Sequence, residues 1–378
     1  MPRTADITVF EGDLVRTLAN FFRSLLESGV ADAILVPCRT GPESMIMPTL
    51  IRDPDRIADA DPLALAFPVN AARLLSRLTR RPSGGKLAAV MRPCEIRAFV
   101  ELVKLNQGRT DDLLLIGLDC PGAYPNREFF TFTETGGTTR DFIESVLPGS
   151  GDPVDAPHLA PACRVCTRPT PDEADLAVGL FGRQDPNALP VLGQTAAGEQ
   201  VLDRLGLQAT GEAPGRQAAI DRLIARRRAE HERMTETTRA ATDSPEKLAA
   251  WFSRCVNCYN CRVACPVCYC RECVFLTDVF DHEPAQYIRW AGRKGALKMP
   301  SDTLFYHLTR MAHISTACVG CGQCSNACPS GIPLAELFIS VAAETQAAFG
   351  YIPGTDMAQP PPLATFEEAE FEDVVGIE

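Results

Sequence analysis

The chain has 378 residues and a formal net charge of −11, with 46% hydrophobic and 22% charged residues. This is the composition of an ordinary globular chain of about two or three domains, and it excludes a largely disordered or collagen-like protein. Charges interrupt every apolar stretch before about 18 residues, so we expect no transmembrane segment. The first residues, MPRTADITVF, also lack the basic and apolar regions of a signal peptide.

The first 210 residues alternate between helical and strand-like patterns. Apolar residues recur at three- and four-residue spacing over residues 14–26, which predicts an amphipathic helix. We predict buried strands at 32–37, 87–91 and 113–118, helices at 69–78 and 95–105, and a further strand at 175–182. Strands that alternate with helices favour βαβ units, so residues 1–210 are expected to form an α/β domain with a mostly parallel sheet.

The rest of the chain divides into three parts. Residues 211–243 look like an exposed connecting helix, because their pattern is helical but has no strong apolar stripe. Within it we interpret the arginine run 226–228 as a solvated helix face and not as a nucleic-acid surface. Residues 244–352 are expected to form a mainly helical domain with helices near 284–297 and 302–312. Residues 353–378, rich in proline and acidic residues, are interpreted as a tail.

Sixteen cysteines are far more than a chain of this size ordinarily carries. Without a signal peptide we expect a cytoplasmic protein, and in that compartment thiols stay reduced. A high cysteine content in an intracellular chain points to bound metal. We therefore turn to the spacing of the cysteines to identify the metal.

Two runs with the spacing C-x2-C-x2-C-x3-C, each followed by proline, predict two 4Fe-4S clusters. In this bacterial ferredoxin pattern the fourth cysteine of each run binds the cluster of the other run. The expected ligands are Cys255, Cys258, Cys261 and Cys328 for cluster 1, and Cys318, Cys321, Cys324 and Cys265 for cluster 2. Zinc also accepts four cysteines, but two complete ferredoxin runs favour iron. Gly320 and Gly322 suit a loop that packs closely around sulfur.

Four further cysteines form a candidate third 4Fe-4S site: Cys94, Cys120, Cys163 and Cys166. Cys94 and Cys120 each follow a predicted parallel strand, and the ends of such strands meet at one edge of a sheet. Cys163 and Cys166 form a C-x-x-C in a loop. The alternative is that these are buried structural cysteines.

Four cysteines remain, namely Cys38, Cys268, Cys270 and Cys273. They could bind a further cluster or a zinc ion together, or they could simply be packed beside the ferredoxin domain. The histidines His158, His231, His282, His307 and His313 are scattered, and we expect them at the surface or in helix packing rather than as bases or ligands. No set of catalytic residues is recognisable.

Several segments resemble the beta-subunit family of coenzyme F420-reducing hydrogenase and formate dehydrogenase. They are KLAAVMRPCEIRAFVEL, LLLIGLDCPGAY and CRVCTRPTPDEADLAVGLFG, and with IMPTLIRDPDRI before them they cover about residues 45–182. The family's turn after proline and cysteine matches Pro93–Ala98, with Phe99 in place of its usual leucine. The resemblance implies an FAD-binding α/β domain beside an iron–sulfur cluster, in a subunit that docks onto a catalytic partner.

The sequence thus predicts an electron-transfer subunit that passes electrons between a flavin and catalytic redox subunits through 4Fe-4S clusters. The larger assembly would be a formate dehydrogenase, a hydrogenase or a heterodisulfide-reductase-like complex. FAD rests on the resemblance alone, because no G-x-G-x-x-G fingerprint is present and no flavin site can be located. The alternatives are a flavin-free ferredoxin-like adaptor whose α/β domain only docks a partner, and clusters that merely stabilise the fold.

Overall fold

The computed structural model describes residues 3–41, 45–82, 84–147, 153–211, 213–270, 272–280, 283–295 and 302–364. Its first part is a sheet with helices: β1 (Arg3–Thr8), α1 (Leu14–Glu27), β2 (Ala33–Thr40), β3 (Met45–Ile51), η1 (Pro54–Asp59), α2 (Ala72–Leu78), β4 (Leu87–Met91), α3 (Pro93–Lys104), β5 (Leu113–Leu118), α4 (Asn126–Glu134), α5 (Thr139–Val146), α6 (Pro161–Arg164), β6 (Leu176–Val178), β7 (Ala188–Gly193) and α7 (Ala196–Arg204).

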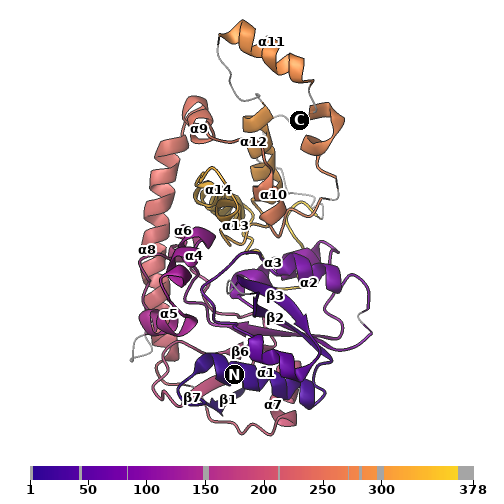
Figure 1. Ribbon diagram of the computed structural model, residues 1–378, viewed down its shortest axis with the longest axis vertical. Coiled ribbons are helices and arrows are strands. Elements are labelled where there is room, and N and C mark those ends of the chain that lie inside the picture. Colours follow the sequence, from indigo (N-terminus) through magenta and orange to yellow (C-terminus); the bar gives the residue numbers. More distant parts are fainter. Residues whose placement is uncertain are drawn as a thin grey trace.

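The second part is helical, and it lies above the sheet in Figure 1. Its elements are α8 (Arg216–Thr242), α9 (Pro245–Trp251), α10 (Asn260–Ala264), η2 (Val274–Leu276), η3 (Asp278–Phe280), α11 (Pro284–Lys294), α12 (Asp302–Ile314), α13 (Gln323–Asn326) and α14 (Leu334–Ala348). The long helix α8 runs alongside both parts. Among the described residues, no helix combines the length and the apolar character needed to cross a lipid bilayer.

The sheet has the strand order β1-β7-β6-β5-β4-β2-β3. Its four central strands are parallel, and the flanking pairings of β3 with β2 and of β7 with β6 and β1 are antiparallel. The mostly parallel α/β sheet predicted from the sequence is therefore confirmed. The sequence prediction missed β1 and β3 at the two edges; β3 contains Pro48, which is tolerated on an edge strand because one side of that strand has no partner.

The two faces of the sheet are buried differently. Ile34 and Val36 of β2 face the side covered by α1, where Leu18 and Phe22 pack. Leu35, between them, faces the opposite side, as the alternation of side chains along a strand requires. On that side the apolar core runs through Phe99 of α3 into the helical part, where it includes Tyr306 of α12 and Phe338 and Leu337 of α14. The two parts of the protein therefore share one core across α3.

The connecting helix α8 is more buried than its polar sequence suggests. Ala219, Ile220 and Leu223 in its first half are buried against the α/β part. The interpretation of residues 226–228 as a solvated face is wrong for Arg227, whose side chain is 1% exposed. Arg227 donates to the carbonyl of Pro121 at 2.6 Å and, through Nε, to Asp155 at 3.1 Å. These polar partners explain why a charged side chain is buried here.

The segment after α14 packs onto α3. Tyr351 Oη donates to Glu101 Oε1 at 2.6 Å, and the backbone N–H of Gly354 donates to the same oxygen at 2.7 Å. Glu101 is fully buried, and Lys104 Nζ lies 3.6 Å from it. Of the predicted acidic tail 353–378, residues 365–378 lie outside the described part of the chain.

Candidate iron–sulfur sites

The third group of cysteines, predicted as the third cluster site, gathers at the carboxyl edge of the sheet. Cys94 lies in the first turn of α3, directly after β4, and Cys120 follows the neighbouring parallel strand β5. The short helix α6 holds Cys163, with Cys166 just beyond its end. Burial, and then the neighbouring thiols of Cys120 and Cys166, raise the pKa of Cys163 to about 12. Burial likewise raises the pKa of Cys94, with Cys321, Cys120 and Cys166 among its nearest charged neighbours.

The two ferredoxin-type runs form loops with the same backbone. Asn257 and Tyr259 have φ angles of 51° and 58°, and Gly320 and Gly322, at the equivalent positions of the second run, have 68° and 76°. Each loop continues into a short helix, α10 after Tyr259 and α13 after Gly322. The two left-handed residues turn each loop back on itself, so that three cysteines of one run can face a common centre.

The fourth cysteine of each run lies near the other run. After burial, the thiols that raise the pKa of Cys255 belong to Cys261, Cys258 and Cys328, which is the group expected for cluster 1. After burial and Arg310, the thiols that act on Cys324 belong to Cys265, Cys321 and Cys318, the group expected for cluster 2. The arrangement of the side chains is compatible with the exchange of fourth cysteines that the spacing predicts, and the ligand sets stay a prediction.

The three groups follow one another through the molecule. Cys321 of the second group is a near neighbour of Cys94. A small cavity there is lined by Cys94, Cys120, Cys163, Cys166 and Cys321. All sixteen cysteines are free thiols. Within the described residues, no three Cys, His, Asp or Glu side chains are grouped closely enough to hold a single metal ion, so the sulfur atoms are neighbours without converging on one point.

Buried and half-buried arginines accompany these cysteines, and the sequence prediction did not find them. Arg92 and Arg227 both act to lower the pKa of Cys120, against the larger effect of burial. Arg97 and Arg310 act in the same direction on Cys318. Arg97 Nε and Arg310 Nε and Nη1 are buried without hydrogen-bond partners. A buried cation needs an anion nearby, and cysteine thiolates around iron–sulfur clusters would supply one, so these residues fit the predicted group.

Two side chains of α12 contact the first group directly. His307 Nε2 lies 3.4 Å from Cys255 Sγ, and its ring stacks on Phe252 at a centroid distance of 4.0 Å. Burial lowers the pKa of His307 to about 3, so the ring is neutral. Tyr306 Oη lies 3.5 Å from Cys261 Sγ. His307 is thus part of the helix packing, as predicted for the histidines, whereas His282 lies outside the described residues.

The four remaining cysteines are not brought together. Cys38 lies in β2, where burial raises the pKa of its thiol to about 11. Asp59 also raises this pKa, whereas the hydrogen bond with Thr49 lowers it. Cys268 has Cys265 and Cys270 as its thiol neighbours, and burial raises its pKa to about 11. No contact between Cys38 and Cys268, Cys270 or Cys273 occurs in the part of the chain that the structure describes.

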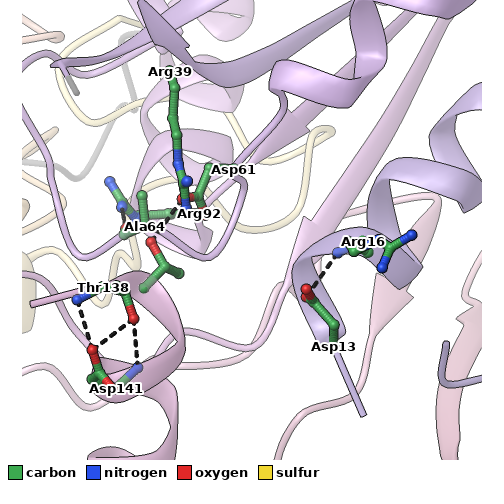
Figure 2. A network of polar contacts seen from close by, with 9 residues as sticks. Asp13, Arg16, Arg39, Asp61, Ala64, Arg92, Thr138 and Asp141 are labelled. Atoms are coloured by element: carbon green, nitrogen blue, oxygen red, sulfur yellow. Dashed lines mark hydrogen bonds and ion pairs between the residues drawn. The ribbon is translucent and has the colours of Figure 1, made fainter. Parts of the chain in front are cut away.

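A polar network fixes the loops at the same edge of the sheet (Figure 2). Asp61 accepts hydrogen bonds from Arg39 Nη2 and Thr139 Oγ1, both at 2.7 Å. Arg92 Nη2 donates to the carbonyls of Ala64 and Ala66 at 2.6 Å. Asp13 caps α1 by accepting from the N–H of Arg16 at 3.0 Å. The network leaves a cleft beside it, whose lining includes Gly12, Asp13, Leu63, Arg140, Leu180 and Arg183.

Fold and cysteine groups together define an iron–sulfur electron-transfer subunit of an oxidoreductase complex. Residues 84–212 match the family model for the C terminus of the beta subunit of coenzyme F420 hydrogenase/dehydrogenase, and residues 251–332 match the 4Fe-4S dicluster domain. The chain therefore carries the C-terminal domain of that beta-subunit family joined to a dicluster iron–sulfur domain, which confirms the resemblance seen in the sequence.

Two relatives match almost the whole length of the chain. The chain is 27% identical over 366 residues to the F420-dependent formate dehydrogenase subunit beta of Methanocaldococcus jannaschii, covering 90% of this chain and 92% of the relative. It is 27% identical over 392 residues to F420-dependent formate dehydrogenase 1 subunit beta of Methanococcus maripaludis, covering 96% of both chains. A chain of the F420-reducing [NiFe] hydrogenase complex from Methanosarcina barkeri aligns at 14% identity, with a TM-score of 0.46, over 62% of this chain and 92% of that one.

Proposed function

We propose that this chain is the beta subunit of an F420-dependent formate dehydrogenase and binds three 4Fe-4S clusters. Cluster 1 would be held by Cys255, Cys258, Cys261 and Cys328, cluster 2 by Cys318, Cys321, Cys324 and Cys265, and cluster 3 by Cys94, Cys120, Cys163 and Cys166. The observation that carries the proposal is the grouping of these twelve thiols into three neighbouring sets of four. Zinc at these positions would not explain a ferredoxin-type exchange of the fourth ligand.

The order of the sets provides a path for single electrons. Cys94 of the third set neighbours Cys321 of the second, and the first and second sets are interlocked by their exchanged cysteines. The path therefore runs from the carboxyl edge of the sheet to Cys258, which is exposed. The protein's contribution is to fix the spacing of the clusters.

We place FAD in the cleft at the carboxyl ends of β1 and β6, where ligands of open α/β sheets characteristically bind. Bound flavin supplies the exchange between two-electron and one-electron transfer. The cleft has a volume of about 240 Å³, below the range of about 300–1,000 Å³ for ligand pockets, so an FAD bound there would extend out of its mouth. Apolar Leu63 and Leu180 line it and could face a ring system, and Arg183 is the lining cation that we assign to the pyrophosphate, since Arg140 pairs with Glu144 of the same lining at 2.8 Å.

The cleft is also adjacent to the third set of cysteines. Asp119 accepts a hydrogen bond from the N–H of Leu180 at 2.8 Å, and Cys120 directly follows Asp119. Replacing Arg183 by Glu should lower the flavin content by about tenfold, equivalent to about 1.4 kcal/mol of binding. The iron content should stay unchanged, and Arg127→Glu, an exposed site on α4, should alter neither. Flavin retained at the wild-type level in Arg183→Glu would place the flavin elsewhere.

A catalytic redox subunit is the expected partner, and the region around Cys258 supports contact with it. Large apolar side chains are exposed here, as at interfaces between subunits. They are Val256, Val263, Val274, Leu276, Val279, Ile288 and Phe305. Helix α11, which bears Ile288, projects away from the rest of the chain (Figure 1). We also propose a cytoplasmic location, because sixteen cysteines without a disulfide bond require a reducing compartment.

The decisive experiment is anaerobic purification of the native assembly, followed by addition of formate and F420. The proposed function predicts formate-dependent reduction of F420 and a yellow, fluorescent extract after acid precipitation. A flavin-free adaptor would instead yield a brown protein without flavin. If the assembly reduces a one-electron dye but not F420, the assignment of F420 as the electron acceptor is contradicted.

A further inference from the structure

Arg310, on α12, is a buried cation without a carboxylate partner. Its side chain is 4% exposed and lies against the rings of Phe338, at 4.8 Å, and Tyr306, at 5.7 Å. Nη2 donates to the carbonyl of Cys261 at 3.2 Å, while Nε and Nη1 are buried without a hydrogen-bond partner. Such a group costs several kcal/mol unless an anion lies close by.

The groups nearest to Arg310 belong to two different cysteine sets. Cys261 comes from the first set, and Cys265 and Cys324 come from the second. Cys318, also of the second set, is a further neighbour of Arg310. As cluster ligands these cysteines would be thiolates, and they would give the guanidinium the anionic neighbours that it otherwise lacks. One guanidinium therefore lies between both sets.

We propose that Arg310 is a positioning residue shared by clusters 1 and 2, whose charge raises the reduction potential of both clusters together. The inference rests on the ligand sets of the proposed function. Each cluster takes up one electron without a bond being made or broken, so reduction adds one negative charge beside the guanidinium. In a water-poor interior a fixed positive charge favours the state with more negative charge, and cluster potentials respond to such charges.

The test is the replacement Arg310→Gln in the full chain, with reduction of the clusters followed by EPR during an anaerobic redox titration. We expect the midpoints of two cluster signals to fall together, while the iron and sulfide contents and the third midpoint stay unchanged. Arg310→Lys, which keeps the charge, should restore most of the shift. Arg228→Gln, an exposed site on α8, is the matched control and should leave all midpoints unchanged.

The outcomes separate this inference from the proposed function. If Arg310→Gln retains two clusters and both midpoints stay at their wild-type values, the inference is overturned and the proposed function is not affected. If Arg310→Gln loses iron, retention of both clusters in Arg310→Lys would support the role of charge, and their loss there too would overturn it. A wild-type protein that lacks the two cluster signals would overturn the proposed ligand sets, and the inference with them.

Discussion

The same left-handed turn is made by different residues in the two cysteine loops. Glycine adopts this backbone without strain, whereas a residue with a Cβ atom pays about 1–2 kcal/mol. Asn257 belongs to the type that tolerates it best, and it also accepts a hydrogen bond from Thr303 Oγ1 at 2.8 Å. For Tyr259 the left-handed backbone costs more free energy, and the tyrosine ring packs edge-on against Tyr306 at a centroid distance of 4.8 Å. The first loop therefore depends on contacts with α12, while the second depends on glycine.

Gly322 has a second constraint that Gly320 lacks. A Cβ atom at Gly322 would lie 2.6 Å from the Cβ of Ala162 in α6, whereas one at Gly320 would meet Ile339 at 3.7 Å, an ordinary contact. We predict that Gly320→Ala lowers the free energy of unfolding by about 1–2 kcal/mol through backbone strain alone. Gly322→Ala should lose about 1–3 kcal/mol more, because α6 must shift. Anaerobic urea denaturation of the cluster-loaded proteins measures both, and equal losses would contradict the constraint.

At the scale of single residues, the grouping of the cysteines could be predicted from the sequence, but the neighbouring arginines could not. Ligand spacing within a run is local, so Cys255–Cys265 and Cys318–Cys328 could be assigned from sequence distance. Arg227 approaches Cys120 from more than a hundred residues away, through a contact with Pro121. In the sequence it stands between Arg226 and Arg228, and nothing in that run distinguishes the buried residue from its neighbours.

The adjacent arginines of α8 differ in how much their polar contacts stabilise the fold. Arg226 and Arg227 both bind Asp155, but the side chain of Arg226 is 42% exposed and that of Arg227 is 1% exposed. Exposed ion pairs contribute about 0–1 kcal/mol, whereas hydrogen bonds of a buried charged group contribute about 1.5–3 kcal/mol each. The first half of α8 is thus attached to the cysteine-bearing loops through Arg227.

Replacement of Arg227 by Gln should therefore weaken the third cluster. We expect a loss of about 1.5–3 kcal/mol in the free energy of unfolding, and a selective loss of iron from Cys120 and Cys163. Arg226→Gln is the matched control and should cost no more than about 1 kcal/mol with full iron retention. Thermal unfolding and iron analysis of the two variants give the comparison. Similar behaviour of both variants would refute the special role of the buried arginine.

The element pattern of the α/β part was readable because apolar periodicity is a local signal. Strands β2, β4 and β5 and helices α1 and α3 lie close to their predicted ranges. The edge strands β1 and β3 were missed, since β1 is half polar and β3 contains a proline. The attachment of Tyr351 and Gly354 to Glu101 was also unpredictable, because it joins groups about 250 residues apart.

For the molecule as a whole, the shared core across α3 means that the three cysteine sets are not confined to one part of the protein. Cys94 lies in the first turn of α3, and apolar residues of this helix belong to the same core as residues of α12 and α14. Gly322 and Ala162 bring the second cysteine loop against the helix that holds Cys163. The third set therefore lies between the two parts of the protein. The family resemblance indicated an adjacent cluster but not this arrangement.

Iron content tests the whole arrangement. At four irons per cluster, three clusters require about twelve irons per chain, and two require about eight. Replacing Cys163 and Cys166 together by Ser should lower a fully loaded sample from about twelve to about eight, because the first two sets take all their ligands from residues 255–328. Cys270→Ser, at an exposed cysteine outside the three sets, should leave the iron content unchanged. A wild-type chain that reaches only about eight irons after full reconstitution would show that the edge of the sheet holds no cluster.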